Sequence, residues 1–208
     1  MPKMTLLEIV QNILSAMDSD EVNSINDTIE SQQVTKIVEE TFYEQFTGVE
    51  MPAFRNVLKI QGLSDLNRPN YLKLQDNVRR IEWLRYRDAS DNNRYNILEF
   101  YPTDVFFARV LSNVSTSANV VLVTDDSGVQ YYIKNNASPS YYTITENNTL
   151  IFDSYDSTYD ATLQASKTFA YGTVEPTWSN TDDYVPPIDS SLFPLLLAEA
   201  KSTSFVNV

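Results

Sequence analysis

The hydrophobic pattern of this 208-residue chain changes its period twice. Apolar residues recur at helical spacing before Met51-Pro52, every second residue after it, and in a nearly continuous run close to the C-terminus. The two periods place side chains on different faces, so a segment that suits a helix does not suit a strand. We therefore predict an α+β fold in which helices occupy both ends of the chain and antiparallel strands lie between them.

The first two predicted helices carry recognisable start signals. Thr5 and Glu8 form a capping-box pattern at the start of a helix over 5–17. A second helix begins near Asp27 or Ser31 and ends near Thr47, with Asp27 as one candidate cap. Gly48 stands where a helix often ends. The apolar faces of these helices contain Leu6, Ile9, Val10, Ile13, Leu14 and Met17 in the first, and Val34, Ile37, Val38, Phe42 and Phe46 in the second.

The last predicted helix begins near Asp189 or Ser191 and is apolar on most sides. Such a helix must be buried, because its apolar surface is favourable only away from water. We expect it to pack on the two N-terminal helices, with Leu14, Ile37, Phe42, Leu192 and Leu196 buried together. Small residues on this helix allow a neighbour to approach closely: Ala198, Ala200, Ser202 and Ser204.

The middle of the chain is rich in strand and turn signals. Asp125-Asp126-Ser127-Gly128 predicts a hairpin turn between strands over 120–124 and 129–134. Glu146-Asn147-Asn148 predicts a second one between 141–145 and 149–152. Further strands are expected over 57–62, 71–74, 81–86 and 163–171, a short helix over 102–112, and a proline-containing loop over 176–191.

The composition disfavours most enzyme classes. The chain contains no histidine and no cysteine, which are the usual general base, thiol nucleophile and soft-metal ligands. Only 4 glycines occur, and none forms a phosphate-binding loop. We predict no catalytic, cofactor-binding or metal site. The net charge of -13 also disfavours binding to nucleic acid or to an anionic membrane.

Three acidic residues and one basic cluster are candidate sites. Asp153, Asp156 and Asp160 offer carboxylates to a cation, but their spacing fits no standard loop and a solvated turn explains them better. Arg79 and Arg80 precede Trp83, Arg85 and Arg87. At period two, Arg85 and Arg87 share a strand face with Trp83, which favours a face exposed to solvent or to another subunit.

Three segments carry a family resemblance. They are MTLLEIVQNILSAMDSDEVNSINDTIESQQV, FDSYDSTYDATLQASKTFAYG and IDSSLFPLLLAEAKSTSF. These segments resemble head-to-tail adaptors of tailed phages, the tail tubular protein A family. This family is also called the neck or head–tail connector family. The resemblance covers residues 4–206 and implies a helical bundle made of 1–50 and 189–208. It also implies a β-rich insertion domain over 51–188.

The resemblance implies a structural virion protein that is not an enzyme. In that family, copies form a ring, usually a dodecamer, between the portal protein and the tail nozzle protein, with tail fibres as a further partner. DNA passes through the ring without specific binding, no membrane is involved, and the virion neck is assembled in the host cytoplasm. Tyrosine is enriched at interfaces. The expected interface residues are Tyr141, Tyr142, Tyr155, Tyr159, Tyr171, Arg85, Arg87, Ala198, Lys201 and Phe205.

Two other functions remain open at this point. A carboxylate-based glycan hydrolase of a virion needs only two acidic residues facing each other across a cleft. A sugar- or receptor-binding β module needs a concave aromatic pocket. The sequence singles out no such pair among its 28 acidic residues and no such pocket.

Overall fold

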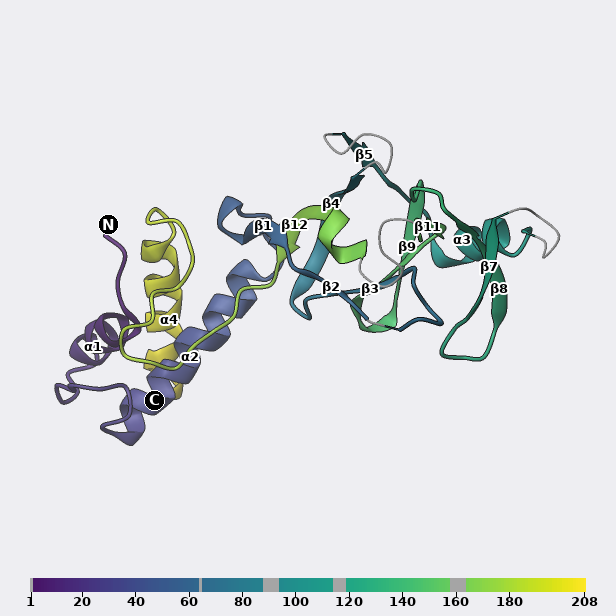
Figure 1. Ribbon diagram of the computed structural model, residues 1–208. Helices are drawn as coiled ribbons and strands as arrows, with labels where there is room; N and C mark the ends of the chain where they lie inside the picture. The colour runs from purple at the N-terminus through teal and green to yellow at the C-terminus, as the bar shows by residue number, and fades with distance from the viewer. Residues whose placement is uncertain (1, 64, 88–93, 114–118, 158–163) are drawn as a thin grey trace. The chain divides into compact units, whose positions relative to one another are not determined.

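The computed structural model describes residues 2–63, 65–87, 94–113, 119–157 and 164–208 (Figure 1). The predicted α+β class is confirmed, with α-helices and both antiparallel and mixed sheets present. The chain divides into two compact units. Met1–Phe54 and Glu175–Val208 make a helical unit, and Arg55–Val174 make a β unit.

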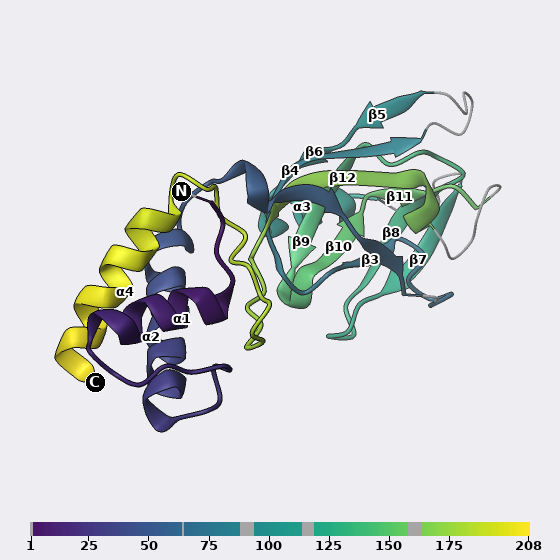
Figure 2. The same ribbon diagram turned by 90° about the vertical axis from the view of Figure 1, so that its left-hand side faces the viewer.

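Three helices of the helical unit surround one apolar core (Figures 1 and 2). They are α1 (Leu6–Ala16), α2 (Ile29–Phe46) and α4 (Phe193–Asn207). Leu14, Phe42 and Leu196 are in this core as predicted, and each is at most 1% exposed. The prediction was wrong in part for the other two residues, because Leu192 is only partly buried against the core and Ile37 is buried outside this cluster. The core thus joins residues from the two ends of the sequence, which the β unit separates.

The helix starts are only partly as predicted. The capping box of α1 is confirmed, because Thr5 Oγ1 accepts a hydrogen bond from the amide of Glu8 and Glu8 Oε2 accepts one from the amide of Thr5. The N-cap of α2 is Thr28, paired with Ser31, and not Asp27. Asp27 instead accepts hydrogen bonds from the amides of residues 23 and 24, which fixes the loop before the helix.

Residues 175–188 belong to the helical unit, whereas the sequence analysis placed them in the β domain. Asp182 Oδ1 accepts a hydrogen bond of 2.8 Å from the amide of Ile25. The carbonyl of Tyr184 accepts one of 2.7 Å from the amide of Leu6, at the start of α1. Trp178 packs against Phe42 with a ring-centroid distance of 5.2 Å. The proline-containing segment is therefore a fixed part of the helical core, although its composition is typical of a loop.

The β unit contains three sheets. The first has the order β1 (Arg55–Leu58), β12 (Thr168–Val174), β4 (Val78–Arg87), β5 (Tyr95–Ile97). The second has the order β2 (Ile60–Gly62), β3 (Tyr71–Leu74), β10 (Thr149–Phe152), β9 (Tyr141–Thr145), β6 (Glu99–Phe100). The third has the order β11 (Ser154–Tyr155), β8 (Gln130–Asn135), β7 (Val120–Thr124), and a short helix, α3 (Thr103–Val110), precedes β7 in the chain.

The second sheet is buried on both faces. Leu72 pairs with Leu150, and both lie in an apolar cluster with Leu58, Leu84 and Ala170 of the first sheet. On the next rung, Tyr71 and Ile151 lie in a different cluster, with side chains of α3 and the third sheet. Successive residues of a strand point to opposite faces, so these two rungs show that the sheet has a core on each side. The continuous apolar run of β10 follows from this position.

Both predicted hairpins are confirmed. Gly128 supplies the left-handed backbone of the first turn, with φ 84°. Asp125 Oδ1 accepts hydrogen bonds from the amides of Ser127 and Val129 in this turn. Burial raises the pKa of Asp125, but these hydrogen bonds outweigh it and hold the pKa below its ordinary value. The short strands β5, β6 and β11 carry no clear sequence signal, and the predicted strand over 57–62 is divided between two sheets.

The core of the helical unit gives the first prediction. Replacing Leu196 (0% exposed) by alanine should lower the free energy of unfolding by about 2–5 kcal/mol, because it leaves a cavity in the core. The matched control is Leu195→Ala on the same helix, where the side chain is 47% exposed and the expected loss is below about 1 kcal/mol. Urea unfolding of dilute protein measures both. Equal losses would contradict the assignment of Leu196 to a core.

Candidate interaction surface

The first sheet of the β unit has one buried and one exposed face. Leu58, Ala170 and Leu84 stand on one rung and are buried against the second sheet. Tyr86, two residues beyond Leu84 on β4, is also buried and packs edge-on against Phe152. The neighbouring residues on each strand point away from this core.

The alternation of side chains along the strands places large apolar residues and arginines on that outer face. One rung joins Val57, Tyr171 and Trp83, and another joins Phe169, Arg85 and Ile97. The next pair is Arg87 with Tyr95. We call this surface the Trp83 face: Val57, Trp83, Arg85, Arg87, Tyr95, Ile97, Phe169 and Tyr171.

Several apolar residues of the Trp83 face are unusually exposed to solvent. Val57 is 56% exposed, Ile97 63% and Phe169 44%. Isolated apolar residues on a surface need no explanation, but a contiguous patch across four strands marks an interaction site. Arginine and aromatic residues are the types most enriched at the centres of protein interfaces.

The rings of the Trp83 face are already ordered by contacts with one another. Trp83 stacks on Tyr171 with centroids 5.6 Å apart and an interplanar angle of 16°. Its second neighbour, Phe169, lies at 5.3 Å. The Arg85 guanidinium carbon lies 4.9 Å from the centroid of the Trp83 ring, within the range of a cation–π interaction. A partner would therefore meet a surface that loses little side-chain entropy on binding.

A β-bulge makes this face possible. Tyr171 pairs with Trp83, but Gly172 pairs with Ile81, so Glu82 is an extra residue on β4. In a regular strand Ile81 and Trp83 would share a face. The bulge lets Ile81 pack against the core while Trp83 points outward. The Glu82 carboxylate is held by Arg55 Nε of β1 at 3.0 Å.

The predicted interface residues are divided between surface and core. Arg85, Arg87 and Tyr171 lie together on the Trp83 face. Tyr142 and Tyr155 differ from the expectation, because they are only 4% and 7% exposed and pack inside their own unit. Burial raises the pKa of Tyr142 to about 12. Tyr159 lies outside the described residues.

The predicted interface residues do not include Val57, Ile97 and Phe169, the most exposed apolar residues of the Trp83 face. The signal for Val57 was its alternation with Leu58 on one strand. The three side chains meet only through strand pairing between distant segments, so no local pattern groups them.

The outer side of α4 is a second apolar surface. Phe193, Leu196, Leu197, Ala200 and Ser204 are buried against the other helices. On the opposite side, Leu195 is 47% exposed, Phe205 59% and Val206 83%. Two of the predicted interface residues, Ala198 and Phe205, are exposed here, and Lys201 is half-buried. We call this surface the α4 outer face: Leu195, Ala198, Glu199, Ser202, Phe205 and Val206.

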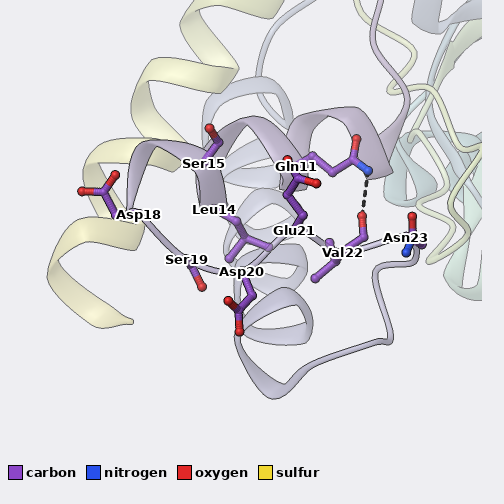
Figure 3. Close-up of a pocket in the computed structure, with 9 residues that line it drawn as sticks. All are labelled: Gln11, Leu14, Ser15, Asp18, Ser19, Asp20, Glu21, Val22 and Asn23. Atoms are coloured by element: carbon purple, nitrogen blue, oxygen red, sulfur yellow. Dashed lines mark hydrogen bonds between the residues drawn. The ribbon is translucent and has the colours of Figure 1, made fainter.

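A hollow of about 770 Å³ lies between α1 and the loop that follows it (Figure 3). Gln11 crosses it and donates a hydrogen bond of 2.8 Å to the carbonyl of Val22. The carboxylates of Asp18, Asp20 and Glu21 line the hollow but point in different directions in Figure 3. Within the described ranges, no group of three or more acidic residues is arranged to hold a metal ion.

Three carboxylates of the β unit are held by structural contacts. Arg68 Nε donates a hydrogen bond of 2.7 Å to Asp65, and this bond is the main cause that keeps the pKa of Asp65 below its ordinary value. Asp126 is paired with the same arginine. Asp153 is buried, which raises its pKa, and its Oδ1 accepts hydrogen bonds from the amides of residues 140 and 141. Asp156 is also buried, so the predicted solvated turn is wrong for Asp153 and Asp156. Asp160 lies outside the described residues.

One concave surface in the β unit is aromatic. Arg109 of α3 lies over the ring of Tyr101 at 4.2 Å and within 5.6 Å of the ring of Tyr141. Tyr101 also donates a hydrogen bond of 2.9 Å to Glu99. These residues line a hollow of about 400 Å³ that opens beside Ile97. The Tyr101 hydroxyl is already engaged with Glu99, and the Arg109 guanidinium lies over the two tyrosine rings.

No protein-family model matches the chain, and no curated protein sequence matches it. None of the described helices is both long enough and apolar enough to cross a membrane.

The bulge gives the second prediction. A Cβ added to Gly172 would overlap the carbonyl oxygen of Arg80 and lie 3.0 Å from Ile81 Cα. Both are backbone atoms, so the strand must move, and Gly172→Ala should cost about 1–3 kcal/mol of stability. Gly48→Ala is the matched control, because nothing lies within 4 Å of its added Cβ. Thermal unfolding followed by circular dichroism compares them, and an unchanged Gly172→Ala midpoint would contradict the bulge.

Proposed function

We propose that the chain is a structural subunit of a tailed-phage virion, the head-to-tail adaptor that forms a ring between the portal protein and the tail nozzle. DNA passes through this ring. The subunit acts by shape and contact, without catalysis or a cofactor, and its place is the neck of the virion. Its helical unit is the bundle that this family is expected to have.

The observation that carries the proposal is the order of the two units. The helical core contains residues from α1, α2 and α4, and the whole β unit is inserted between α2 and α4. This is the arrangement that the resemblance implies: helices from both chain ends with a β-rich domain between them.

The surface chemistry supports the same function. A ring subunit needs complementary surfaces on two of its sides. The Trp83 face and the α4 outer face are two exposed apolar surfaces on different units. A hydrolase would need a carboxyl group with a raised pKa in an open cleft. Neither Asp65, which is paired with Arg68, nor Asp153, which is buried beneath backbone donors, fits that description.

Assembly is the direct test of this function. We expect the protein to form discrete rings, alone or on addition of the portal protein from the same virus. Mass photometry measures the number of copies, and negative-stain microscopy shows the shape. A chain that remains monomeric under both conditions would contradict the adaptor function.

The passage of DNA gives a separate prediction. The net charge of -13 should prevent appreciable binding to duplex DNA at physiological salt, where electrostatic attraction extends only about 8 Å. A gel-shift titration measures this. Tight binding that disappears when Arg79, Arg80, Arg85 and Arg87 are replaced would instead indicate a protein that grips DNA.

A sugar- or receptor-binding module is the second candidate, favoured by the hollow beside Tyr101, Arg109 and Tyr141. Aromatic rings stack on sugars, and an arginine binds carboxylates such as those of acidic sugars. Binding to a glycan array that is lost in Tyr101→Ala, by a protein that does not assemble, would favour this candidate over the adaptor.

A further inference from the structure

The net charge of the chain is divided very unequally between the two units. Met1–Phe54 and Glu175–Val208 together contain 15 Asp and Glu, 3 Lys and no Arg, a net charge of -12. Arg55–Val174 contain 13 Asp and Glu and 12 Lys and Arg, a net charge of -1. All of the arginines are therefore in the β unit, and nearly all of the excess negative charge is in the helical unit.

The Trp83 face concentrates arginine within the β unit. Arg85 is exposed and extends over the Trp83 ring, and Arg87 follows two residues later on the same face of β4. Val57, Ile97 and Phe169 around them are exposed, and Trp83 and Tyr171 are half-buried. The chemistry of this face therefore fits a partner that is apolar at its centre and acidic around it, since apolar contact supplies affinity and opposite charge supplies orientation.

The helical unit carries an exposed apolar surface on α4 and nearly all of the excess negative charge of the chain. The exposed apolar residues Leu195, Phe205 and Val206 recur along one side of the helix, with Glu199 among them. The unit around this helix carries the net charge of -12. The small side chains of Ala198 and Ser202 leave room for the larger rings of a partner.

We propose that the Trp83 face of one copy binds the α4 outer face of the next copy, head to tail. This inference rests on the proposed function, because it specifies which surfaces join the copies of the ring. Pairing of two Trp83 faces is disfavoured, since it would bring Arg85 and Arg87 of both copies together. The charge division therefore selects a contact between different surfaces, which closes into a ring when the rotation between copies permits.

The test uses two variants of the full chain. In the face variant, Arg85→Glu and Ile97→Glu reverse one charge and remove one exposed apolar side chain. In the helix variant, Leu195→Lys and Phe205→Lys place cations opposite the arginines. Each should raise the dissociation constant for assembly by at least about tenfold. Circular dichroism should show the wild-type fold for both, because all four side chains are at the surface.

Matched controls carry similar changes elsewhere. Lys134→Glu with Leu122→Glu alters one exposed cation and one apolar residue that is 43% exposed, both on the third sheet. Val49→Lys with Val185→Lys alters two exposed apolar residues of the helical unit outside α4. Both controls should assemble like the wild-type chain in mass photometry.

A mixing experiment tests the head-to-tail order directly. The face variant keeps an intact α4 outer face, and the helix variant keeps an intact Trp83 face. The intact Trp83 face of the helix variant can therefore join the intact α4 outer face of the face variant, so an equimolar mixture should form complexes of two or more copies that neither variant forms by itself. Assembly of the helix variant by itself to the wild-type size would overturn the proposed pairing.

The remaining outcomes separate this inference from the proposed function. Wild-type rings together with unchanged assembly of both variants would overturn the pairing and leave the adaptor function standing. A wild-type chain that stays monomeric with the portal protein would overturn both. If that monomer binds a single-stranded oligonucleotide, and the face variant does not, the Trp83 face is a nucleic-acid platform instead.

Discussion

Tyr71 and Leu72 are neighbours on β3, and both are buried although their side chains leave opposite faces of the same sheet. The second sheet is thus covered on one face by the first sheet and on the other by α3 and the third sheet. Burial of apolar surface is the main favourable contribution to folding, and here it is gathered around a single sheet. The first sheet uses only one face in this core, and the residues left on its other face are those of the Trp83 face.

Much of the fold could be predicted because local signals are strong where neighbouring residues determine the structure. The Thr5–Glu8 capping box and the Asp125–Gly128 turn are examples, since each is satisfied within a few residues. The cap of α2 was predicted less well, because Asp27 and Thr28 are both good caps and only the surrounding loop decides between them. The surface position of Arg85 beside Trp83 followed from the period of the strand.

Features that depend on distant pairing could not be predicted in the same way. Tyr142 and Tyr155 have the residue type of an interface, yet their strands place them in the core. The extra residue at Glu82 reverses which face of the sheet the side chains of β4 occupy on either side of it. No residue near Glu82 in the sequence indicates this change. The segment over 176–191 has the composition of a loop, but Asp182 and Tyr184 bind it to the helices through groups that are far away in the sequence.

The pairing of β1 with β12 has a consequence for how such a protein changes over time. Arg55 and Thr173 are partners on adjacent strands, so the chain enters the β unit and leaves it at nearly the same point. A unit attached in this way can be lengthened, shortened or replaced while the two connecting segments keep their separation. The helical core and the β unit can therefore diverge at different rates, with one preserving its packing while the other adapts to new neighbours.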